Sequence, residues 1–543
     1  MTAPVEARAW GGEVVEELVE GRPCLVYRER RRHIAAMIDD LRRWGDRVSL
    51  VRGERRICYA DHVRHIDLVA AELIRRGLRP GGRVMLLAGN SPEWVTVFWA
   101  VFRSGAVAVP SNAWWSAAEV AHAVGVIQPD LVFADARRAA LLPAGGRAVA
   151  VLGEDEVREL LEHAPAEVAP VTVEPATEDE PGMILFTSGT MGAAKGVLLS
   201  HRSVIANVHN LLARTNRLPS RLGPDHEGTV SLMCLPLFHI GGIQTLVTAQ
   251  LSGGRLLFLD GRFDPVQVLS LIERERVRFF GGVPTMVSRV LDCPRLPEFD
   301  TSSLVSVAMG GAVVVPELAE RIKRGFPSAR RSITSVYGQT EAGGALTSAN
   351  GTDLLDRPGC VGRPLPVVEV RIANPGPDGV GEVTARTPTL MTGFWADGTE
   401  LENPVDSRGW LHTGDLGRLD ADGYLYIVGR SREIIIRGGE NVAPGHIENC
   451  LLQHPEVADV AVVGLPHASL GEEVAASVVL RRPAAATPTE LAAHCRAGLA
   501  HYEVPSRWSV STNALPLNAA GKVAKRDVIK NWRDTPVSEE AGS

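Results

Sequence analysis

The first half of the chain alternates amphipathic segments with short apolar ones. Apolar residues recur every three or four positions over 63–73, which predicts a helix that ends near Gly77. Residues 83–89 are typical of a buried strand, and 92–103 of a second helix. The same spacing predicts further strands at 131–135, 148–152, 255–259, 278–280 and 304–308, and a helix at 265–275. Strands that alternate with helices predict a mostly parallel sheet covered on both faces.

The pattern changes near residue 360, where strands and turns become denser. Strands predicted at 368–373, 381–387 and 424–429 indicate a small β-rich subdomain. A compact α+β section follows, with helices predicted near 444–453 and 488–500 and strands near 457–464 and 474–480. We therefore predict an α/β fold, with an N-terminal domain over 1–429 and a C-terminal domain over 430–543.

One long apolar segment raises the question of whether the chain crosses a membrane. Residues 229–251 contain no Asp, Glu, Lys or Arg, but Pro236, His239 and the pair Gly241-Gly242 interrupt them. These interruptions favour a buried strand, a loop and a core helix over a membrane-spanning helix. The N-terminus lacks the order of a signal peptide, and the C-terminus lacks a lipidation or peroxisomal signal.

The composition narrows the class of protein. A chain of 543 residues is too long for one ordinary core, and 45% hydrophobic with 22% charged residues is typical of soluble globular proteins. The net charge of −7 argues against nucleic acid as the main partner. Seven cysteines without a CxxC pair predict neither a disulfide framework nor a structural zinc site. We expect a reducing, cytoplasmic location and no integral membrane segment.

The segment 184–201 carries the strongest chemical signal. An apolar run is followed by hydroxyl residues, glycines and one lysine, which predicts a strand, a tight loop and the start of another element. The polar residues of this loop are Thr187, Ser188, Gly189, Thr190 and Lys195. Glycines let backbone N–H groups converge on an anion, so a polyphosphate is favoured, with a plain polar turn as the alternative. The spacing matches neither a P-loop nor a nucleophile elbow.

Other segments add groups suited to a nucleotide. A strand that ends in Gly310-Gly311-Ala312 lets a flat ring approach the backbone, although a simple turn explains it equally well. Tyr337 could stack on a base, and Glu341 could bind Mg²⁺ through oxygen. A carboxylate at Asp415 suits a ribose diol. Taken singly, these features are equally compatible with core packing, turn formation or exposed surface.

The order of the motifs is more specific than any one of them. SGT-x-G-xx-KG, GGA, YGQTE, HTGD, GR…GGEN and AGK run from 186 to 523 and resemble the adenylate-forming superfamily. That superfamily contains acyl-CoA synthetases, adenylation domains of peptide synthetases and beetle luciferases. The resemblance extends over nearly the whole chain. It implies a large N-terminal domain of parallel sheets flanked by helices with a small β-barrel, and a smaller mobile C-terminal domain that carries a catalytic lysine.

The resemblance also implies two half-reactions: a carboxylate attacks the α-phosphate of ATP and releases pyrophosphate, and a thiol then attacks the acyl-adenylate. The β- and γ-phosphates would be held by Thr187, Ser188, Gly189, Thr190 and Lys195. The adenine pocket would be formed by Gly310, Gly311, Ala312, Tyr337 and Gln339, with Thr340 near the α-phosphate.

The remaining roles follow from the same resemblance. Glu341 would bind Mg²⁺, while Asp415 and Arg430 would hold the ribose. Lys522 would bridge the attacking carboxylate and the α-phosphate, and His239 would gate the carboxylate site, with a core histidine as its alternative. The hinge position is occupied by Arg432, and the pantetheine tunnel of coenzyme A would be shaped by Gly438 and Gly439.

The sequence departs from the family pattern at three positions. Met191 stands where a hydroxyl residue is usual, Ala194 where proline is usual, and Arg432 where Asp or Lys is usual. Losing one hydroxyl weakens phosphate contacts by about 1 kcal/mol, which does not abolish activity.

The substrate class follows partly from an absent charge. Relatives that activate amino acids place an aspartate after the phosphate loop, whereas residues 234–254 contain no acidic residue. Gly241, Gly242, Gly311 and Gly338 leave room beside apolar neighbours, which suits a hydrophobic acid; fatty, aromatic and alicyclic acids stay open.

The sequence therefore predicts an AMP-forming acid–CoA ligase that uses ATP, Mg²⁺ and coenzyme A, and it leaves a homodimer open. One alternative acceptor is the phosphopantetheine of a separate carrier protein, because no carrier domain follows Lys522. A nucleotide-binding sensor without turnover is a further alternative, motivated by Met191. Luciferase-like oxidation is compatible with the fold, but no residue specifically supports it.

Overall fold

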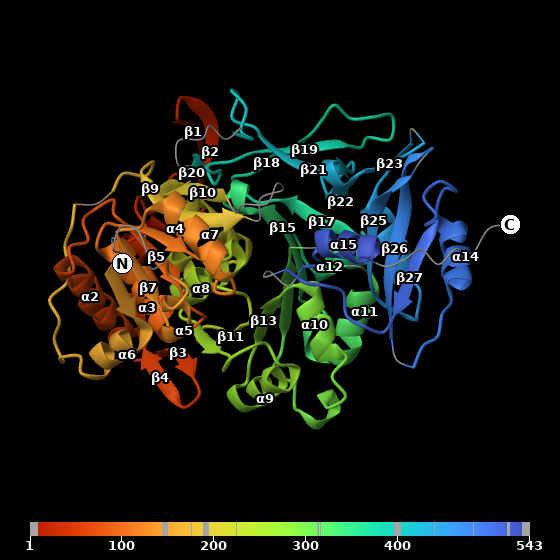
Figure 1. Cartoon of the computed structure of the whole chain (residues 1–543). Coiled ribbons are helices and arrows are strands. Elements are labelled where there is room, and N and C mark those ends of the chain that lie inside the picture. Colours follow the sequence, from red (N-terminus) through yellow and green to blue (C-terminus); the bar gives the residue numbers. More distant parts are fainter. Residues whose placement is uncertain are drawn as a thin grey trace.

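The structure is a computed structural model of the chain. It describes residues 9–143, 150–174, 176–187, 195–223, 225–311, 314, 316–395, 403–438, 440–467, 469–481, 483–518 and 522–534. A large part of sheets and helices occupies most of the molecule, and a smaller α+β part lies beside it (Figure 1). This arrangement confirms the predicted α/β fold class.

The first sheet has seven strands in the order β20-β10-β9-β6-β5-β7-β8. Its strands are β5 (Arg83–Leu87), β6 (Val107–Pro110), β7 (Leu131–Ala134), β8 (Ala150–Gly153), β9 (Pro181–Thr187), β10 (Lys195–Ser200) and β20 (Gly393–Trp395). β5 to β9 pair in parallel, whereas β10 pairs antiparallel with both β9 and β20. The phosphate-loop segment is therefore the connection of an antiparallel hairpin, β9–β10.

The second sheet has thirteen strands in the order β18-β19-β21-β22-β17-β16-β15-β14-β13-β11-β12-β3-β4. Its parallel centre consists of β3 (Val48–Arg52), β11 (Val230–Met233), β12 (Arg255–Phe258), β13 (Phe279–Gly282), β14 (Ser306–Gly310) and β15 (Ile333–Gln339). The antiparallel strands are β4 (Arg55–Cys58), β16 (Gly344–Ala349), β17 (Cys360–Pro364), β18 (Glu369–Ala373), β19 (Gly381–Arg386), β21 (Leu411–Leu419) and β22 (Leu425–Arg430).

The β-rich part predicted after residue 360 continues this second sheet. β17 pairs with β16 on one side and β22 on the other, so both parts share one hydrogen-bonded surface. At the far edge, β18 pairs with β19 alone among the described strands. The expected closure into a barrel is therefore not seen in the strand pairing of the described residues, which leaves this part as an open antiparallel sheet.

Helices fill the space between the sheets and cover their outer faces. The shared core packs α2 (Tyr59–Arg75), α3 (Pro92–Arg103), α7 (His201–Arg214) and α8 (Ile240–Leu251) against both sheets. The outer faces carry α4 (Ala117–Ile127) and α5 (Ala136–Ala139) on one sheet, and α9 (Pro265–Glu275), α10 (Pro284–Leu291) and α11 (Pro316–Gly325) on the other. Shorter elements are β1 (Val14–Val19), β2 (Arg22–Tyr27), α1 (Ala36–Leu41), α6 (Glu154–Glu162) and α12 (Gly351–Asp356).

Two predicted helices, α3 and α9, agree with the structure at both ends, and each begins at a recognisable capping sequence. Ser91 accepts a hydrogen bond from Trp94 N at the start of α3, and Pro92 follows it. Asp264 caps α9 in the same way, followed by Pro265. A capping side chain followed by proline satisfies a free backbone N–H group and fixes the first turn.

The uncharged segment 229–251 forms β11 followed by α8, as predicted. His239 is the residue before the first turn of α8, so the segment changes from strand to helix where Pro236 and the pair Gly241-Gly242 lie. Over the described residues, no helix combines the length and apolar character that crossing a membrane requires.

The smaller part is a five-stranded sheet with three helices. Its elements are β23 (Ile435–Arg437), β24 (Glu440–Val442), α13 (Pro444–Leu452), β25 (Val457–His467), β26 (Gly471–Leu480), α14 (Pro488–Gly498), β27 (Arg507–Ser511) and α15 (Lys525–Asp534). The chain leaves the large sheet at Arg430 and enters this sheet at Ile435. We propose that the domains divide in this interval, as the sequence predicts.

The carboxyl group of Asp459, in the smaller part, leads to a prediction about how stability depends on pH. Burial raises the pKa of Asp459 from 3.8 to about 6, although its carboxylate accepts a hydrogen bond from Val460 N. The folded state therefore holds this proton more tightly than the unfolded state, so ionising Asp459 destabilises the fold as the pH rises through 6.

Asp459→Asn is expected to raise the free energy of unfolding at pH 8, by at most about 3 kcal/mol for a pKa difference of roughly two units. The gain should shrink as the pH falls from 6 to 4 and vanish below 4, where both states hold the proton. Thermal unfolding measured across this range, with the exposed Asp155→Asn as control, checks this. An equal gain at pH 4 and pH 8 would contradict it.

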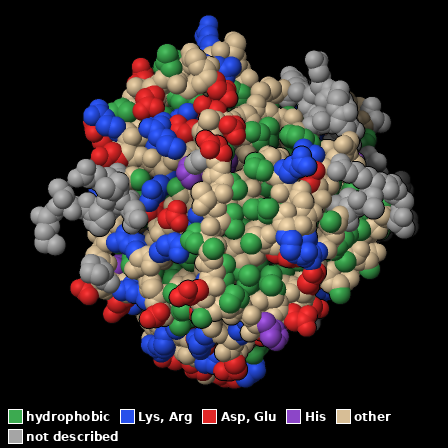
Figure 2. Space-filling model, turned by 90° about the vertical axis from the view of Figure 1, so that its left-hand side faces the viewer, with side chains coloured by type: hydrophobic (Ala, Val, Ile, Leu, Met, Phe, Trp, Pro, Cys, Tyr) green, Lys and Arg blue, Asp and Glu red, His purple; other side chains and the backbone are tan. Residues whose placement is uncertain are grey.

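One face of the large part carries both hydrophobic and charged side chains. Figure 2 displays hydrophobic side chains near the centre of this face, with lysine, arginine, aspartate and glutamate interspersed around them. Charges of both signs are mixed, so this face lacks the single-sign field that steers a polyanion toward a protein.

Candidate active site

Asp415 connects three strands at the centre of the candidate site. Its carboxylate accepts a 2.7 Å hydrogen bond from Tyr337 Oη and lies 2.9 Å from Arg430 Nε. Asp415 and Arg430 are direct partners in the register of β21 and β22, while Tyr337 comes from β15. The side chain of Asp415 is only 5% exposed. An aromatic ring, a carboxylate and a guanidinium are thus held together, each from a different strand.

Burial dominates the electrostatics of this cluster. It raises the pKa of Asp415 above its usual value, while Arg430, the Tyr337 hydroxyl and Lys522 act in the opposite direction. Burial also raises the pKa of Tyr337, and the neighbouring carboxylate adds to this effect. The phenol is therefore a hydrogen-bond donor at neutral pH. Gln339 Nε2 lies 3.5 Å from the carbonyl oxygen of Thr413, at the outer limit of a hydrogen bond.

Lys522 reaches this cluster from the C-terminal end of the chain. Gly311 has a φ of +81°, and a Cβ atom placed on it would lie 2.7 Å from Lys522 Cε. The lysine side chain therefore occupies the space that a side chain at residue 311 would fill. Lys522 N donates to Asn518 Oδ1, and Asn518 N donates to Lys522 O at 2.7 Å, so two hydrogen bonds join these residues.

The charge on Lys522 is sensitive to its neighbours. Loss of water around the amine lowers its pKa, Arg430 lowers it further, and Asp415 raises it. The guanidinium of Arg430 forms an ion pair with the carboxylate of Asp415, and the ammonium of Lys522 interacts with the same carboxylate electrostatically. Two cations around one buried anion leave a net positive charge, which an incoming phosphate would neutralise.

His239 lies within electrostatic range of Lys522. Burial lowers its pKa to about 4 and the positive charge of Lys522 contributes, so the imidazole is neutral at physiological pH. Its Nε2 atom is buried and, among the described residues, has no hydrogen-bond partner. Phe238 packs beside it, with 4.5 Å between ring centroids. A neutral imidazole with an unused nitrogen can bind a carboxylic acid or its carboxylate.

The phosphate-loop hairpin and Glu341 are joined by one short segment. Met391 N donates to the carbonyl oxygen of Glu341 at 3.0 Å, and Thr392 N donates to Leu198 O in β10 at 3.0 Å. Thr187 and Lys195 face each other at the ends of β9 and β10. Lys195, Thr187 and Glu341 are therefore placed at one side of the site by backbone hydrogen bonds.

The other predicted positions are less informative. Thr340 begins a short 3₁₀ turn directly after β15, and Gly310 ends β14 beside Val336 of β15. Gly438 has a φ of +61° at the turn between β23 and β24, and Arg432 lies in the exposed 3₁₀ turn before β23. Five predicted residues lie outside the described ranges: Ser188, Gly189, Thr190, Ala312 and Gly439. Met191 and Ala194 also lie outside them.

Gly242 and Gly338, which the sequence predicts to leave room for the acid, are required for a different reason. A Cβ atom at Gly242 would collide with the carbonyl oxygen of Pro236, and one at Gly338 would collide with that of Gly344. These glycines are required by close approach of two backbone segments. Gly241 differs, because its nearest neighbour would be Leu235 Cδ1 at 3.7 Å.

Several residues near the site were not identified from the sequence. Val283, at the start of α10, flanks Gly311 together with Lys522. Phe394 lies under Lys195, with 5.2 Å from the ammonium to the ring centroid. Trp114 contacts the edge of Phe238, with centroids 5.2 Å apart. Each is an apolar residue whose local pattern indicates core packing, so only the tertiary structure places it at the site.

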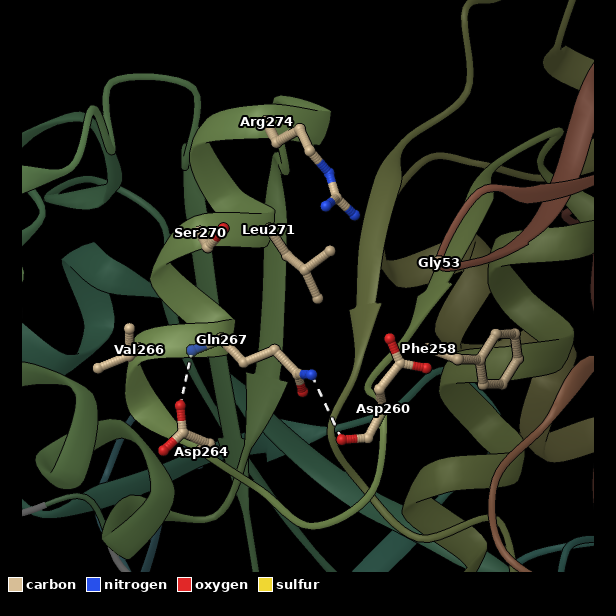
Figure 3. Close-up of a pocket in the computed structure, with 9 residues that line it drawn as sticks. All are labelled: Gly53, Phe258, Asp260, Asp264, Val266, Gln267, Ser270, Leu271 and Arg274. Atoms are coloured by element: carbon tan, nitrogen blue, oxygen red, sulfur yellow. Dashed lines mark hydrogen bonds between the residues drawn. The ribbon is translucent and has the colours of Figure 1, made fainter.

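A cavity of about 330 Å³ lies elsewhere, between the β3–β4 turn and α9 (Figure 3). It is lined by Gly53, Phe258, Asp260, Asp264, Val266, Gln267, Ser270, Leu271 and Arg274. Gln267 crosses it to donate to the carbonyl oxygen of Asp260 at 3.3 Å. None of the predicted site residues lines this cavity, so it is separate from the candidate active site.

Comparison with known proteins identifies the class to which this fold and site belong. The family model of the AMP-binding enzyme matches residues 38–395, and that of the AMP-binding enzyme C-terminal domain matches residues 446–522. The chain therefore belongs to the AMP-binding enzyme family, which confirms its resemblance to the adenylate-forming superfamily.

Individual relatives cover almost all of the chain. It is 33% identical to a feruloyl-CoA synthase of Amycolatopsis over 88% of its own length and 95% of the relative. It is 32% identical to the long-chain-fatty-acid–CoA ligase FadD13 of Mycobacterium tuberculosis, over 88% and 94%. ATP-bound MatB from Rhodopseudomonas palustris superimposes with a TM-score of 0.80 at 28% identity, over 92% of this chain and 99% of MatB.

Proposed function

We propose that the protein is an AMP-forming acid–CoA ligase that adenylates a hydrophobic carboxylic acid and transfers the acyl group to coenzyme A. The placement of Lys522 against Gly311, within electrostatic range of both His239 and the Asp415 cluster, carries this proposal. A cation at this point can contact the carboxylate of the acid and the α-phosphate of ATP together. The acid–CoA ligases among its relatives support the same reaction class.

In the first half-reaction, a carboxylate oxygen of the acid attacks the α-phosphorus of ATP and pyrophosphate leaves. Lys522 stabilises the negative charge that develops between the two reactants, and His239 orients the carboxylate through its free Nε2. Tyr337 provides a wall for the adenine base. Asp415 accepts from the ribose hydroxyls, and Arg430 holds Asp415 in position. The phosphates released as pyrophosphate lie toward Thr187 and Lys195.

The residues fit a magnesium ion that is held mainly by its nucleotide. The described residues contain no group of three potential metal-binding side chains, and Glu341 supplies a single carboxylate beside the hairpin. Mg²⁺ commonly uses one or two carboxylates together with phosphate oxygens and water. When bound, the ion would neutralise phosphate charge, and Glu341 would hold it.

In the second half-reaction, the thiol of coenzyme A attacks the acyl carbon of the acyl-adenylate, a thioester forms, and AMP leaves with the bond electrons. We assign the pantetheine passage to the turn at Gly438, whose φ of +61° favours glycine, a residue without a side chain. The amide N–H of Gly438 donates to Leu470 O at 2.8 Å, which fixes the turn.

An aromatic wall beside His239 supports a hydrophobic acid. Phe238 contacts both the imidazole and Trp114, and the side chain of Trp114 remains 51% exposed. An exposed indole next to the carboxylate-binding imidazole offers apolar surface to the tail of an acid. This wall accepts a flat ring or an alkyl chain, so it favours apolar acids over small polar ones.

Trp114→Ala is expected to lower kcat/KM for aromatic or long-chain acids by roughly 2- to 12-fold, the equivalent of about 0.5–1.5 kcal/mol for one aromatic contact. Acetate, which is too short to reach the indole, should be used at an unchanged rate. Trp114→Phe should restore most of the loss. A uniform loss for all acids would show that Trp114 acts only on the fold.

The function is tested by incubating the purified protein with Mg-ATP, coenzyme A and a panel of fatty, aromatic, alicyclic and amino acids, and identifying products by mass spectrometry. Acyl-CoA from one apolar acid class is expected. Acyl-adenylate without acyl-CoA would instead favour a carrier-protein thiol as acceptor. Absence of both products with every acid would contradict the proposed function.

A further inference from the structure

Helix α10 runs from the catalytic site to the smaller domain. At its start, Val283 and Lys522 both lie within 4 Å of the position that a Cβ atom of Gly311 would occupy. At its end, Asp292 lies 3.7 Å from Arg481, which follows β26 of the smaller domain. Eight helical residues separate these points by about 12 Å. Figure 1 shows α10 and α11 between the large sheet and the smaller domain.

Asp292 has an unusual place for an acidic residue. It is the C-cap residue of α10, where the carbonyl ends of the helix carry partial negative charge and disfavour a carboxylate. Two arginines compensate for this: Arg321 from α11 pairs with the same carboxylate oxygen as Arg481 does. The Arg321 side chain is 13% exposed and holds Asp292 toward the smaller domain.

We propose that the ion pair between Asp292 and Arg481 positions Lys522 for adenylation by fixing the smaller domain at a further point. This inference rests on the proposed function, because it assumes that Lys522 acts in that half-reaction. Besides Lys522, helix α13 of the smaller domain contacts β22 of the large domain. The pair between Asp292 and Arg481 adds a contact at the far end of α10, about 12 Å along the helix from the site, and further restricts rotation of the smaller domain. Asp292 and Arg481 are therefore positioning residues that touch no substrate.

The size of the effect is set by solvent. The Asp292 side chain is 53% exposed and that of Arg481 27%, so water screens the pair. Exposed ion pairs contribute at most about 1 kcal/mol, which limits the expected change to roughly 2- to 5-fold. Salt weakens exposed pairs, so the contribution should fall as ionic strength rises.

The test compares Asp292→Asn, Arg481→Gln and the double variant in the two half-reactions. We expect both single variants to slow acyl-adenylate formation by roughly 2- to 5-fold, with Asp292→Asn the slower because Arg321 and Arg481 then repel each other. The double variant should match Arg481→Gln, because the pair is already broken. Thioester formation from supplied acyl-adenylate should be unchanged. The difference from wild type should disappear near 1 M salt, where screening is strong.

A matched control lies six residues from Asp292. Glu298 forms an exposed ion pair with Arg295 at 2.8 Å within the large domain, so Glu298→Gln should leave both half-reactions unchanged. Trypsin cleavage after Arg430 or Arg432, both exposed, gives a readout that needs no activity. Cleavage should be faster in the Asp292 and Arg481 variants than in wild type or Glu298→Gln.

Three results would overturn the inference: adenylation and trypsin cleavage unchanged in Arg481→Gln, equal losses in both half-reactions, or a double variant whose loss is the product of the single losses. Failure of the proposed function gives a different result, since wild type itself would then form no acyl-adenylate. In that case, the cleavage rates alone decide whether the pair holds the two domains together.

Discussion

Lys522→Ala should lower acyl-adenylate formation by roughly 10²–10³-fold, because it removes the positive charge that stabilises the reacting carboxylate and α-phosphate. Arg430, the second cation of the cluster, is paired with Asp415 and so does not replace the lost charge. Pyrophosphate exchange with the preferred acid measures this half-reaction alone. Thioester formation from supplied acyl-adenylate should continue, since that step breaks a bond already activated.

The pH dependence offers a second check on Lys522. Its pKa is lowered, so the amine loses its proton, and adenylation should decline, at a pH below the ordinary lysine value of 10.5. Lys522→Arg should remove this alkaline decline, because arginine stays charged. Lys530→Ala, on an exposed position of α15, serves as the control. Normal adenylation by Lys522→Ala would refute the mechanism.

Asp415→Asn should reduce kcat/KM for ATP by roughly 10²-fold. The amide keeps the size of the side chain but removes the charge that Tyr337 and Arg430 share, and hydrogen bonds to a charged group contribute about 1.5–3 kcal/mol each. The loss should appear mainly in KM for ATP, because we propose that Asp415 binds the ribose of the nucleotide and does not touch the acid. Steady-state kinetics with ATP varied at saturating acid measures it.

Asp422→Asn is the matched control for Asp415, since Asp422 is exposed at the turn between β21 and β22. Its kinetics should equal those of wild type. If Asp415→Asn changed KM for the acid as strongly as KM for ATP, the carboxylate would have a wider structural role than ribose binding. Circular dichroism of the variant distinguishes that role from misfolding.

The elements that the sequence predicts most accurately are those whose ends are marked by residues close to them in the chain. Helices 92–103 and 265–275 begin at a capping side chain followed by proline, and both ends agree with the structure. The pairing of β17 with β16, which joins the β-rich part to the large sheet, has no such signal. Sheet order depends on contacts between strands far apart in sequence, such as β3 with β12. Local periodicity does not encode those contacts.

The candidate site shows the same division. Tyr337, Asp415, Arg430 and Lys522 were identified through the resemblance, and the structure brings them together around one carboxylate. Trp114 was not identified, because two adjacent tryptophans give no pattern that separates core packing from a substrate wall. The roles assigned to the phosphate loop stay predictions, since residues 188–194 lie outside the described part of the chain.

Gly241 and Gly242, beside the proposed acid site, differ in the substitutions that the backbone around them allows. Gly242 is locked by the carbonyl oxygen of Pro236, so every larger residue there forces the backbone apart. Gly241 meets only Leu235 at van der Waals distance and can accept a side chain. Residue 241 therefore tolerates a larger side chain, whereas residue 242 does not. We expect a substitution at residue 241 to narrow the acid preference, while residue 242 stays fixed by the fold.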